Sequence, residues 1–143
     1  MNCDCIALKL KDVIVLTEKF YAKRIKELSL PILKNHLPLF YFLSDAERPL
    51  AFTEIFNSWE ISKSSLSEVI NKYHRLGFIE KIDSAEDKRS FSIALTEKGK
   101  ELRNILAELE DELMTKFYSN FSTDLKVSFE KNVDQVIDNL SEI

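Results

Sequence analysis

Four short hydroxyl side chains fall within six consecutive residues: Ser62, Ser64, Ser65 and Ser67. Serine is a poor helix former, so helix propensity does not account for this cluster. Small polar side chains at the start of a helix can reach base edges in the major groove of DNA. Ser62 also stands where an N-cap residue belongs. The cluster is therefore a candidate contact for nucleic acid.

The residues around this cluster predict a helix over 62–76 with one polar face. Apolar residues at three- and four-residue spacing form its inward stripe, and Gly77 follows where a left-handed cap residue belongs. The N–H groups of a helix start attract phosphate, and cations contact the DNA backbone. A merely solvated helix face has the same composition, and that interpretation stays open. The candidate contacts are Ser62, Lys63, Ser64, Ser65, Ser67, Glu68, Asn71, Lys72 and Arg75.

A charged turn over 83–89 separates two short runs that predict strands. Residues 78–82 are apolar and β-branched, and Phe91, Ile93 and Leu95 alternate with small residues in the period of a half-buried strand. Arg89 at the tip of such a hairpin can enter a narrow minor groove, and Asp87 can hold it by an ion pair. A solvated charged turn is the alternative interpretation.

The remaining patterns predict helices on both sides of this region, over 6–28, 38–46, 52–59, 97–118 and 122–140. A tight turn over 59–61 joins the third of these to the serine-rich helix, and a hairpin follows that helix. This order is that of a winged helix-turn-helix. We therefore expect a mainly α fold with a small β-hairpin wing.

Composition excludes several other classes. Glycine occurs twice and proline three times in 143 residues, whereas a many-stranded β-sandwich needs a turn signal every ~8–12 residues. The same scarcity of glycine excludes a glycine-rich phosphate loop. No apolar run approaches the ~18 residues of a membrane span, and the N-terminus lacks the basic region of a signal peptide. We expect one domain over 1–143, located in the cytoplasm.

Charge is unevenly distributed along the chain. The net charge is −4, but residues 61–100 carry eight cations and six carboxylates, while residues 101–143 carry four cations and ten carboxylates. The only positive segment thus coincides with the predicted helix-turn-helix and wing. The excess is small, so it supports a nucleic-acid site only weakly.

Two pieces of the stretch from Leu37 to Gly99 carry a resemblance to a known family. One is Ser62…Leu66…Ile70…Leu76-Gly77-Phe78-Ile79, and the other runs from Asp87-Lys88-Arg89 to Leu95-Thr96-Glu97-Lys98-Gly99. The stretch resembles the DNA-binding lobe of the MarR family, the multiple-antibiotic-resistance regulators. The second piece is similar to that family's wing, an Asp-x-Arg tip followed by a Leu-Thr-x-x-Gly strand end.

This resemblance implies a homodimeric transcription regulator that binds double-stranded DNA. Residues of about 37–99 would form the DNA-binding lobe, and about 6–30 and 100–143 would form dimerisation helices. Two copies of the 62–76 helix would enter successive major grooves roughly 34 Å apart on a pseudo-palindromic operator. Lys88 and Arg89 would contact DNA from the wing, with Asp87 in support.

Several signals remain open for the regulator that this resemblance implies. A small amphipathic ligand is the family's usual signal, and its candidate pocket residues are Phe20, Tyr21, Phe40 and Tyr41, which also suit a hydrophobic core. Cys3 and Cys5 are candidate redox thiols, although the adjacent Asp4 disfavours a thiolate. His36 and His74 are too few for a metal site. We expect no metal, cofactor or membrane partner.

Two other function classes are alternatives to DNA binding. A winged helix used only for protein contacts fits the same elements. An enzyme is disfavoured, because the sequence offers no nucleophile–base pairing, no paired histidines and no glycine loop.

Overall fold

The computed structural model describes residues 4–86 and 90–143. Helices form where apolar residues recur every three or four positions. The elements follow in the order α1 (Ile6–Glu27), the 3₁₀ turn η1 (Lys34–His36), α2 (Leu37–Ala46), β1 (Leu50–Ala51), α3 (Phe52–Ser58), α4 (Lys63–Arg75), β2 (Ile79–Asp83), β3 (Phe91–Leu95), α5 (Glu97–Phe117) and α6 (Thr123–Ser141). The mainly helical fold with a small wing is confirmed.

Two short elements escape the sequence patterns. η1 precedes α2, and β1 is a strand of two residues directly after the Arg48-Pro49 break. β1 pairs with β3 through Leu50 opposite Ile93, so the hairpin becomes a three-stranded antiparallel sheet in the order β1-β3-β2. Two residues are too few to show an alternating pattern, because the period of a strand needs several residues to appear.

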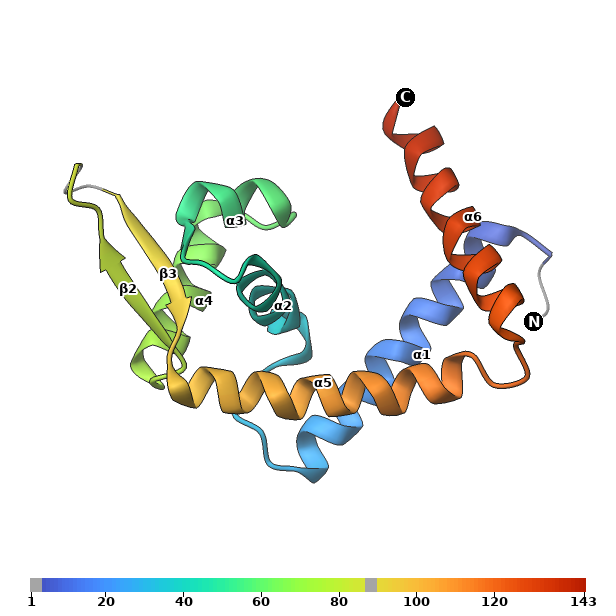
Figure 1. Cartoon of the computed structure of the whole chain (residues 1–143), viewed down its shortest axis with the longest axis horizontal. Helices are drawn as coiled ribbons and strands as arrows, with labels where there is room; N and C mark the ends of the chain where they lie inside the picture. Colours follow the sequence, from blue (N-terminus) through green and yellow to red (C-terminus); the bar gives the residue numbers. More distant parts are fainter. Residues whose placement is uncertain (1–3, 87–89) are drawn as a thin grey trace. The chain divides into compact units, whose positions relative to one another are not determined.

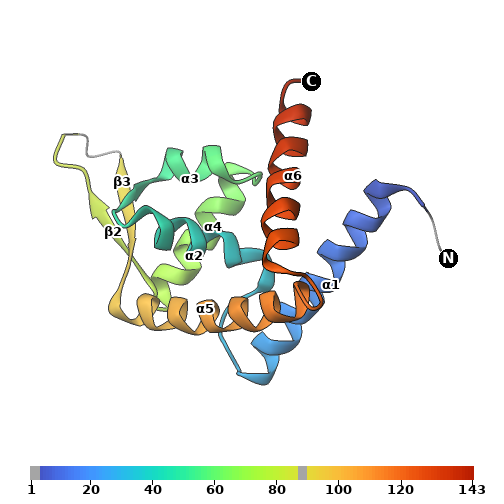
Figure 2. The same cartoon turned by 45° about the vertical axis from the view of Figure 1, so that its right-hand side comes forward.

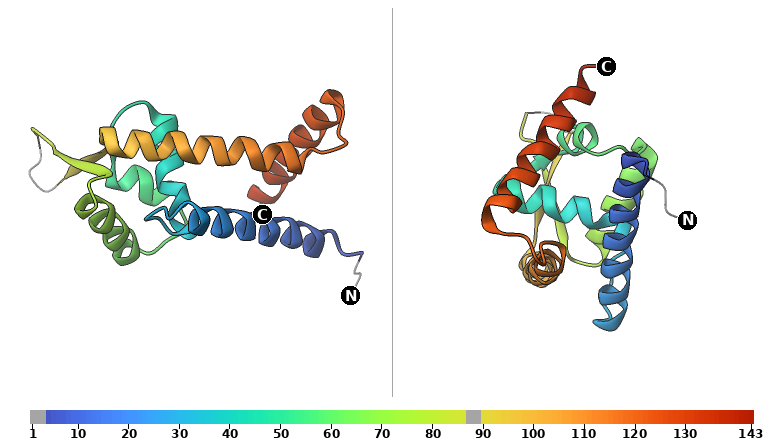
Figure 3. Two further views of the ribbon diagram at one scale, coloured as in Figure 1. Left: turned by 90° about the horizontal axis from the view of Figure 1, so that it is seen from below. Right: turned by 90° about the vertical axis from the view of Figure 1, so that its right-hand side faces the viewer.

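The contacts divide the chain into two compact units, Met1–Leu109 and Glu110–Ile143. The first unit contains the core, in which α2, α3 and α4 pack with the sheet and the first part of α5. Its fully buried side chains include Phe40, Ile55, Leu66, Tyr73 and Ile93. The far ends of the paired strands β2 and β3 project beyond these helices (Figures 1 and 2, and the left-hand view of Figure 3).

The second unit contains the end of α5 and the whole of α6. Aromatic side chains at the turn between them, Phe117, Tyr118, Phe121 and Phe129, pack edge to face. Ser122 caps α6, since its Oγ accepts a hydrogen bond from the Leu125 N–H at 3.1 Å. No residue of α6 is buried.

Among the described residues, no helix combines the length and the apolar character that crossing a bilayer requires.

Candidate nucleic-acid interface

The start of α4 is built from its serine cluster. The Ser62 Oγ accepts a hydrogen bond from the Ser65 N–H at 3.1 Å and so caps the helix, as the sequence predicts. The same oxygen lies 2.9 Å from the Ser65 Oγ and 3.3 Å from the Ser64 Oγ. The hydroxyls therefore form one connected group at the positive end of the helix dipole.

The outward face of α4 is exposed along its whole length. Seven of the candidate contacts are exposed, and Ser65 and Lys72 are half-buried. The exposed ones are Ser62, Lys63, Ser64, Ser67, Glu68, Asn71 and Arg75. No described part of the chain covers this face. Glu68 is its one carboxylate, and the cytosine amino group is the base-edge group that a carboxylate accepts from.

The opposite face of α4 is anchored in the core. Leu66, Val69, Ile70 and Tyr73 are buried on this side. Phe40 and Phe78 pack edge-on or tilted against the Tyr73 ring, with ring centroids 5.1 and 6.5 Å away. Burying one face of α4 in this way fixes the direction of the other.

A hydrogen-bond chain ties the same helix to η1. The Leu33 N–H donates to the Tyr73 hydroxyl at 3.3 Å, and this hydroxyl lies 2.7 Å from the His36 Nδ1. Burial lowers the pKa of His36, and the nearby Lys72 ammonium lowers it further. Neutral His36 can then accept the hydroxyl proton at Nδ1, which satisfies all three groups.

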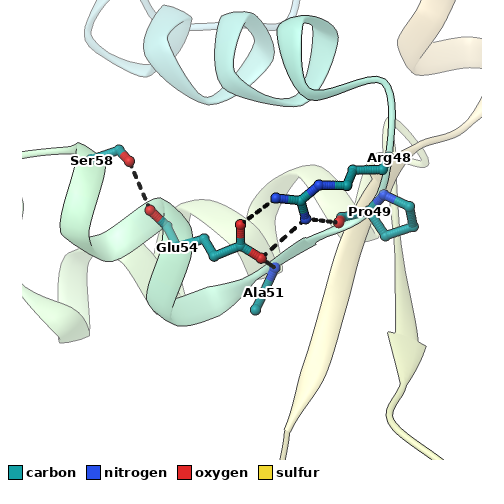
Figure 4. A network of polar contacts seen from close by, with 5 residues as sticks. All are labelled: Arg48, Pro49, Ala51, Glu54 and Ser58. Atoms are coloured by element: carbon teal, nitrogen blue, oxygen red, sulfur yellow. Dashed lines mark hydrogen bonds and ion pairs between the residues drawn. The ribbon is translucent and has the colours of Figure 1, made fainter.

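The helix that precedes α4 is held at its start by an ion pair. The Arg48 guanidinium donates to both carboxylate oxygens of Glu54, at 2.7 and 3.2 Å, and the Ala51 N–H donates to the Glu54 Oε1 at 3.2 Å (Figure 4). These hydrogen bonds lower the pKa of Glu54. The carboxylate thus joins the loop before α3 to the first turn of α3.

The end of α4 is fastened to the start of α5. Gly77 adopts a φ of +83°, which confirms the left-handed cap. The Thr96 hydroxyl donates to the Gly77 carbonyl, and the Lys98 Nζ donates to the Leu76 carbonyl at 2.7 Å. The Thr96 Oγ1 also accepts the Gly99 N–H at 3.1 Å, so it caps α5. Side chains of α5 therefore satisfy carbonyls that α4 leaves unpaired.

Cations lie on the exposed side of this assembly. The Lys63 Nζ lies 5.5 Å from the centre of the Phe56 ring, and the Lys72 Nζ lies 5.3 Å from that of Tyr73. Within the described residues, neither these lysines nor Arg75 forms an ion pair with a carboxylate. Their charge is therefore available to phosphate groups.

Lys81 and Lys98 are not among the contacts predicted from the sequence. The Lys81 Nζ donates to the Asn71 Oδ1 at 2.7 Å and so joins β2 to α4. The register of the sheet explains this position, because Lys81 pairs with Ile93, an inward member of β3. Directly opposed residues point to the same face of a sheet. Lys98 acts on the end of α4, as described above.

The wing is described up to Glu86 and from Ser90 onward. β2 and β3 pair from Ile79 opposite Leu95 to Asp83 opposite Phe91. A hollow of ≈ 330 Å³ lies between α3, α4 and the start of β3, with Phe52, Ser67 and Phe91 in its lining. The predicted wing contacts Lys88 and Arg89, and their predicted support Asp87, lie outside the described residues.

The candidate pocket residues divide into two groups. Phe40 is fully buried and belongs to the core, whereas Phe20, Tyr21 and Tyr41 are half-buried and pack against it. The Tyr41 hydroxyl donates to the Tyr21 hydroxyl at 3.2 Å, which joins α2 to α1. The structure therefore places the half-buried Tyr21 in contact with both Phe20 and Tyr41.

The candidate redox and metal residues stay apart. Cys5 is exposed just before α1, and Cys3 lies outside the described residues. His36 belongs to the Tyr73 chain, whereas His74 is exposed on α4. Over 4–86 and 90–143, no three His, Cys, Asp or Glu side chains gather in a way that could hold a metal ion.

Residues 30–90 match the model of the MarR family. This segment contains α2, β1, α3, α4 and β2, the elements that build the exposed face of α4. It is a MarR-family winged helix. The family resemblance that the motifs of 62–79 and 87–99 carry is thereby confirmed.

A curated protein similar to this chain is the HTH-type transcriptional regulator BilQ of Clostridioides difficile, which is 25% identical over 89 residues. The match covers 59% of this chain and 60% of that protein. The chain thus spans less than two thirds of the length of this relative.

Solved structures share the fold of this chain over nearly all of its length. MepR of S. aureus in a DNA-binding conformation superposes with a TM-score of 0.81 at 16% identity, covering 95% of this chain and 98% of that one. Apo MarR of E. coli gives a TM-score of 0.77 at 14% identity, with the same coverage. The likeness extends beyond residues 30–90 to the flanking helices.

Proposed function

We propose that this chain is a transcriptional regulator that binds double-stranded DNA as a homodimer. The observation that carries this proposal is the exposed polar face of α4. Its inner side is locked into the core, and no described residue covers its outer side. Hydroxyls and amides on this face suit base edges, and its cations suit phosphates. The matched winged helix of the MarR family supports the same conclusion.

Apolar side chains on the flanking helices support a second copy of this chain as the partner. On α6, Leu125, Val136, Ile137 and Leu140 are between 48% and 62% exposed. On α1, Ile6, Ile14 and Leu16 are between 57% and 68% exposed. Large exposed apolar faces mark protein interfaces. A symmetric dimer that covers them would place two α4 helices in major grooves about 34 Å apart.

We propose a small aromatic ligand as the regulatory signal. Phe20, Tyr21 and Tyr41 combine half-buried rings with two hydroxyls at one place between α1 and α2. A ligand there would contact rings and exchange hydrogen bonds with the hydroxyls. Melting curves recorded with a panel of aromatic acids test this idea. We expect stabilisation of the native chain and a smaller shift for Tyr21→Phe, whereas equal shifts would refute it.

Selection of bound duplexes from a random pool tests DNA binding and symmetry together. We expect an inverted repeat with half-sites one helical turn apart. Affinity for the recovered duplex should fall steeply with salt, because binding releases counterions from each phosphate that a cation neutralises. If no duplex is retained at low salt, a winged helix that contacts only proteins becomes the better interpretation.

A further inference from the structure

The contact between Asn71 and Lys81 has a chemical consequence that depends on its direction. Both side chains are exposed, and the Lys81 Nζ donates to the Asn71 Oδ1 at 2.7 Å. An ammonium group has three donors and no acceptor, so only the amide oxygen can face it. The Asn71 NH₂ group must therefore point the other way. The Lys81 ammonium thus leaves the NH₂ group of the Asn71 amide free.

Two further contacts hold Lys81 in this position. Its Nζ lies 5.3 Å from the centre of the Phe91 ring, within range of a cation–π interaction. Its backbone pairs with Ile93 in the middle of the β2–β3 ladder. The lysine is thereby held on the side of the wing that meets α4, where its side chain reaches a helix residue ten positions earlier in the sequence.

Away from their contact, Asn71 presents its NH₂ group and Lys81 its remaining ammonium donors. Free asparagine recognises adenine with a donor to N7 and an acceptor for the N6 amino group. In this pair Lys81 takes one of the two lone pairs of the amide oxygen, and its adjacent ammonium would repel an amino group that approached the other. Guanine presents two acceptors, N7 and O6, at the corresponding place in the major groove. A group that only donates matches guanine.

We propose that Lys81 is a specificity-determining residue that acts through Asn71 and makes the α4–wing contact read guanine in preference to adenine. This inference rests on the proposed DNA binding and adds a base preference to it. It assigns Lys81 a role as a positioning residue for the Asn71 amide, in addition to any attraction that its charge exerts on phosphate.

Parallel selections of duplexes from one random pool test this role. We expect the native chain to recover guanine at one position of each half-site. Lys81→Met should shift that position toward adenine, with a change in the guanine-to-adenine ratio on the order of tenfold, since one bidentate pair discriminates by that much or more. Lys81→Arg keeps a donor for the Asn71 oxygen and should retain guanine.

Lys63→Met is the matched control, because it removes the same charge from the α4 side and leaves Asn71 untouched. It should weaken binding to all sequences about equally and reduce the salt dependence. Asn71→Ala should abolish the base preference, and adding Lys81→Met to it should change the preference no further. Circular dichroism melting shows whether each variant keeps its fold.

The possible failures are distinguishable. If the native chain recovers an inverted repeat but Lys81→Met keeps the same base at every position, the role of Lys81 is refuted and DNA binding stands. If Lys81→Met instead weakens binding to all sequences equally, as expected for Lys63→Met, Lys81 is a phosphate contact only and its role in base preference is also refuted. If the native chain retains no duplex, the proposed function fails and this inference fails with it.

Discussion

Gly77 and Gly99 are the only glycines of the chain, and each serves a different purpose. Gly77 needs its positive φ, but a side chain there would meet nothing closer than 3.8 Å, at Lys98. Gly99 has the reverse constraint. A Cβ at Gly99 would collide with the backbone carbonyl of Phe78, which cannot move without disturbing the start of β2.

Substitutions at these two positions should therefore differ in cost. Gly99→Ala should lower the free energy of unfolding by about 3 kcal/mol or more, because the clash involves backbone in a packed region. Gly77→Asn should cost about 1 kcal/mol or less, since asparagine tolerates the left-handed region. Urea unfolding of both variants measures the difference. Equal costs would show that α5 and β2 do not approach as closely as described.

The His36–Tyr73 pair makes stability depend on pH. The pKa of His36 is lowered in the folded chain, so the unfolded chain binds the extra proton first as pH falls. The contribution of His36 to stability is fully present above the ordinary histidine pKa of 6.5. It is lost as pH falls from there through the lowered pKa of His36 in the folded chain. We expect the free energy of unfolding to decrease between pH 7.5 and 5.5.

His36→Gln provides the test of this pH dependence. Glutamine retains an acceptor for the Tyr73 hydroxyl but does not titrate. Its unfolding free energy should change less over the same range than that of the native chain. Glu54 does not contribute to this pH dependence. Its pKa is lowered, so protonation of Glu54 destabilises the chain only at more acidic pH. An unchanged slope in His36→Gln would assign the effect to other groups.

At the scale of elements, individual side chains bind the backbone groups that are left unpaired at each end of α4. Ser62 caps its start, and carbonyls at its end are bound by Thr96 and Lys98. Capping satisfies backbone groups that a helix leaves unpaired. The start of α4 has a second role in the proposed function, because it faces DNA. These two roles can be separated by the choice of substitution.

Ser62→Asp should separate the cap from the DNA contact. Aspartate caps a helix as well as serine does, so the melting temperature should stay close to that of the native chain. Its charge would repel phosphate and should lower DNA affinity at least tenfold. Ser62→Ala should instead cost about 1 kcal/mol of stability through loss of the cap.

Ser122→Asp is the matched control for this prediction, since Ser122 caps α6 with the same hydrogen bond. It adds the same charge at another helix start and should leave DNA affinity close to the native value. If both aspartate variants lose affinity equally, overall charge is responsible rather than a contact at the start of α4.

At the scale of the whole molecule, the excess of carboxylates and the exposed apolar residues of α6 lie in the same segment, 101–143. Residues 101–143 carry ten carboxylates against four cations, which disfavours contact with phosphate. The same segment contains the exposed apolar residues of α6. Helices in proteins gain most of their stability from the packing of an apolar face, whereas no residue of α6 is buried within this chain. The segment therefore fits association with another copy better than DNA binding.

Ile137→Asp should disrupt that association. A carboxylate in an apolar interface loses hydration without a partner, which is strongly unfavourable. Sedimentation equilibrium should show a dimer for the native chain and a shift toward monomer for the variant. DNA affinity should fall with it, because a monomer contacts a single half-site.

Gln135→Glu serves as the control, because it adds the same charge about half a helical turn away from Ile137. It should remain dimeric. A native chain that sediments as a monomer would exclude the second copy as the occupant of the apolar face of α6.

Local patterns were sufficient to determine the helices, the hairpin and the polar face of α4. Ser62, Gly77 and Ser122 each act within a few residues of their own position, so their roles can be predicted from the sequence. The same holds for Thr96 as the cap of α5, but not for its bond to the Gly77 carbonyl. The wing motif and the serine cluster are also local patterns, and they were sufficient to indicate the resemblance to the MarR family. The contacts proposed for Lys88 and Arg89 stay predictions.

Only the tertiary structure decided which distant residues meet. The hydrogen bond from Lys81 to Asn71, the chain from Leu33 through Tyr73 to His36 and the collision that excludes a side chain at Gly99 all join separate elements. Periodicity shows which side of a helix or strand is buried. It does not show which neighbour packs there, because that depends on how the elements fill their shared core.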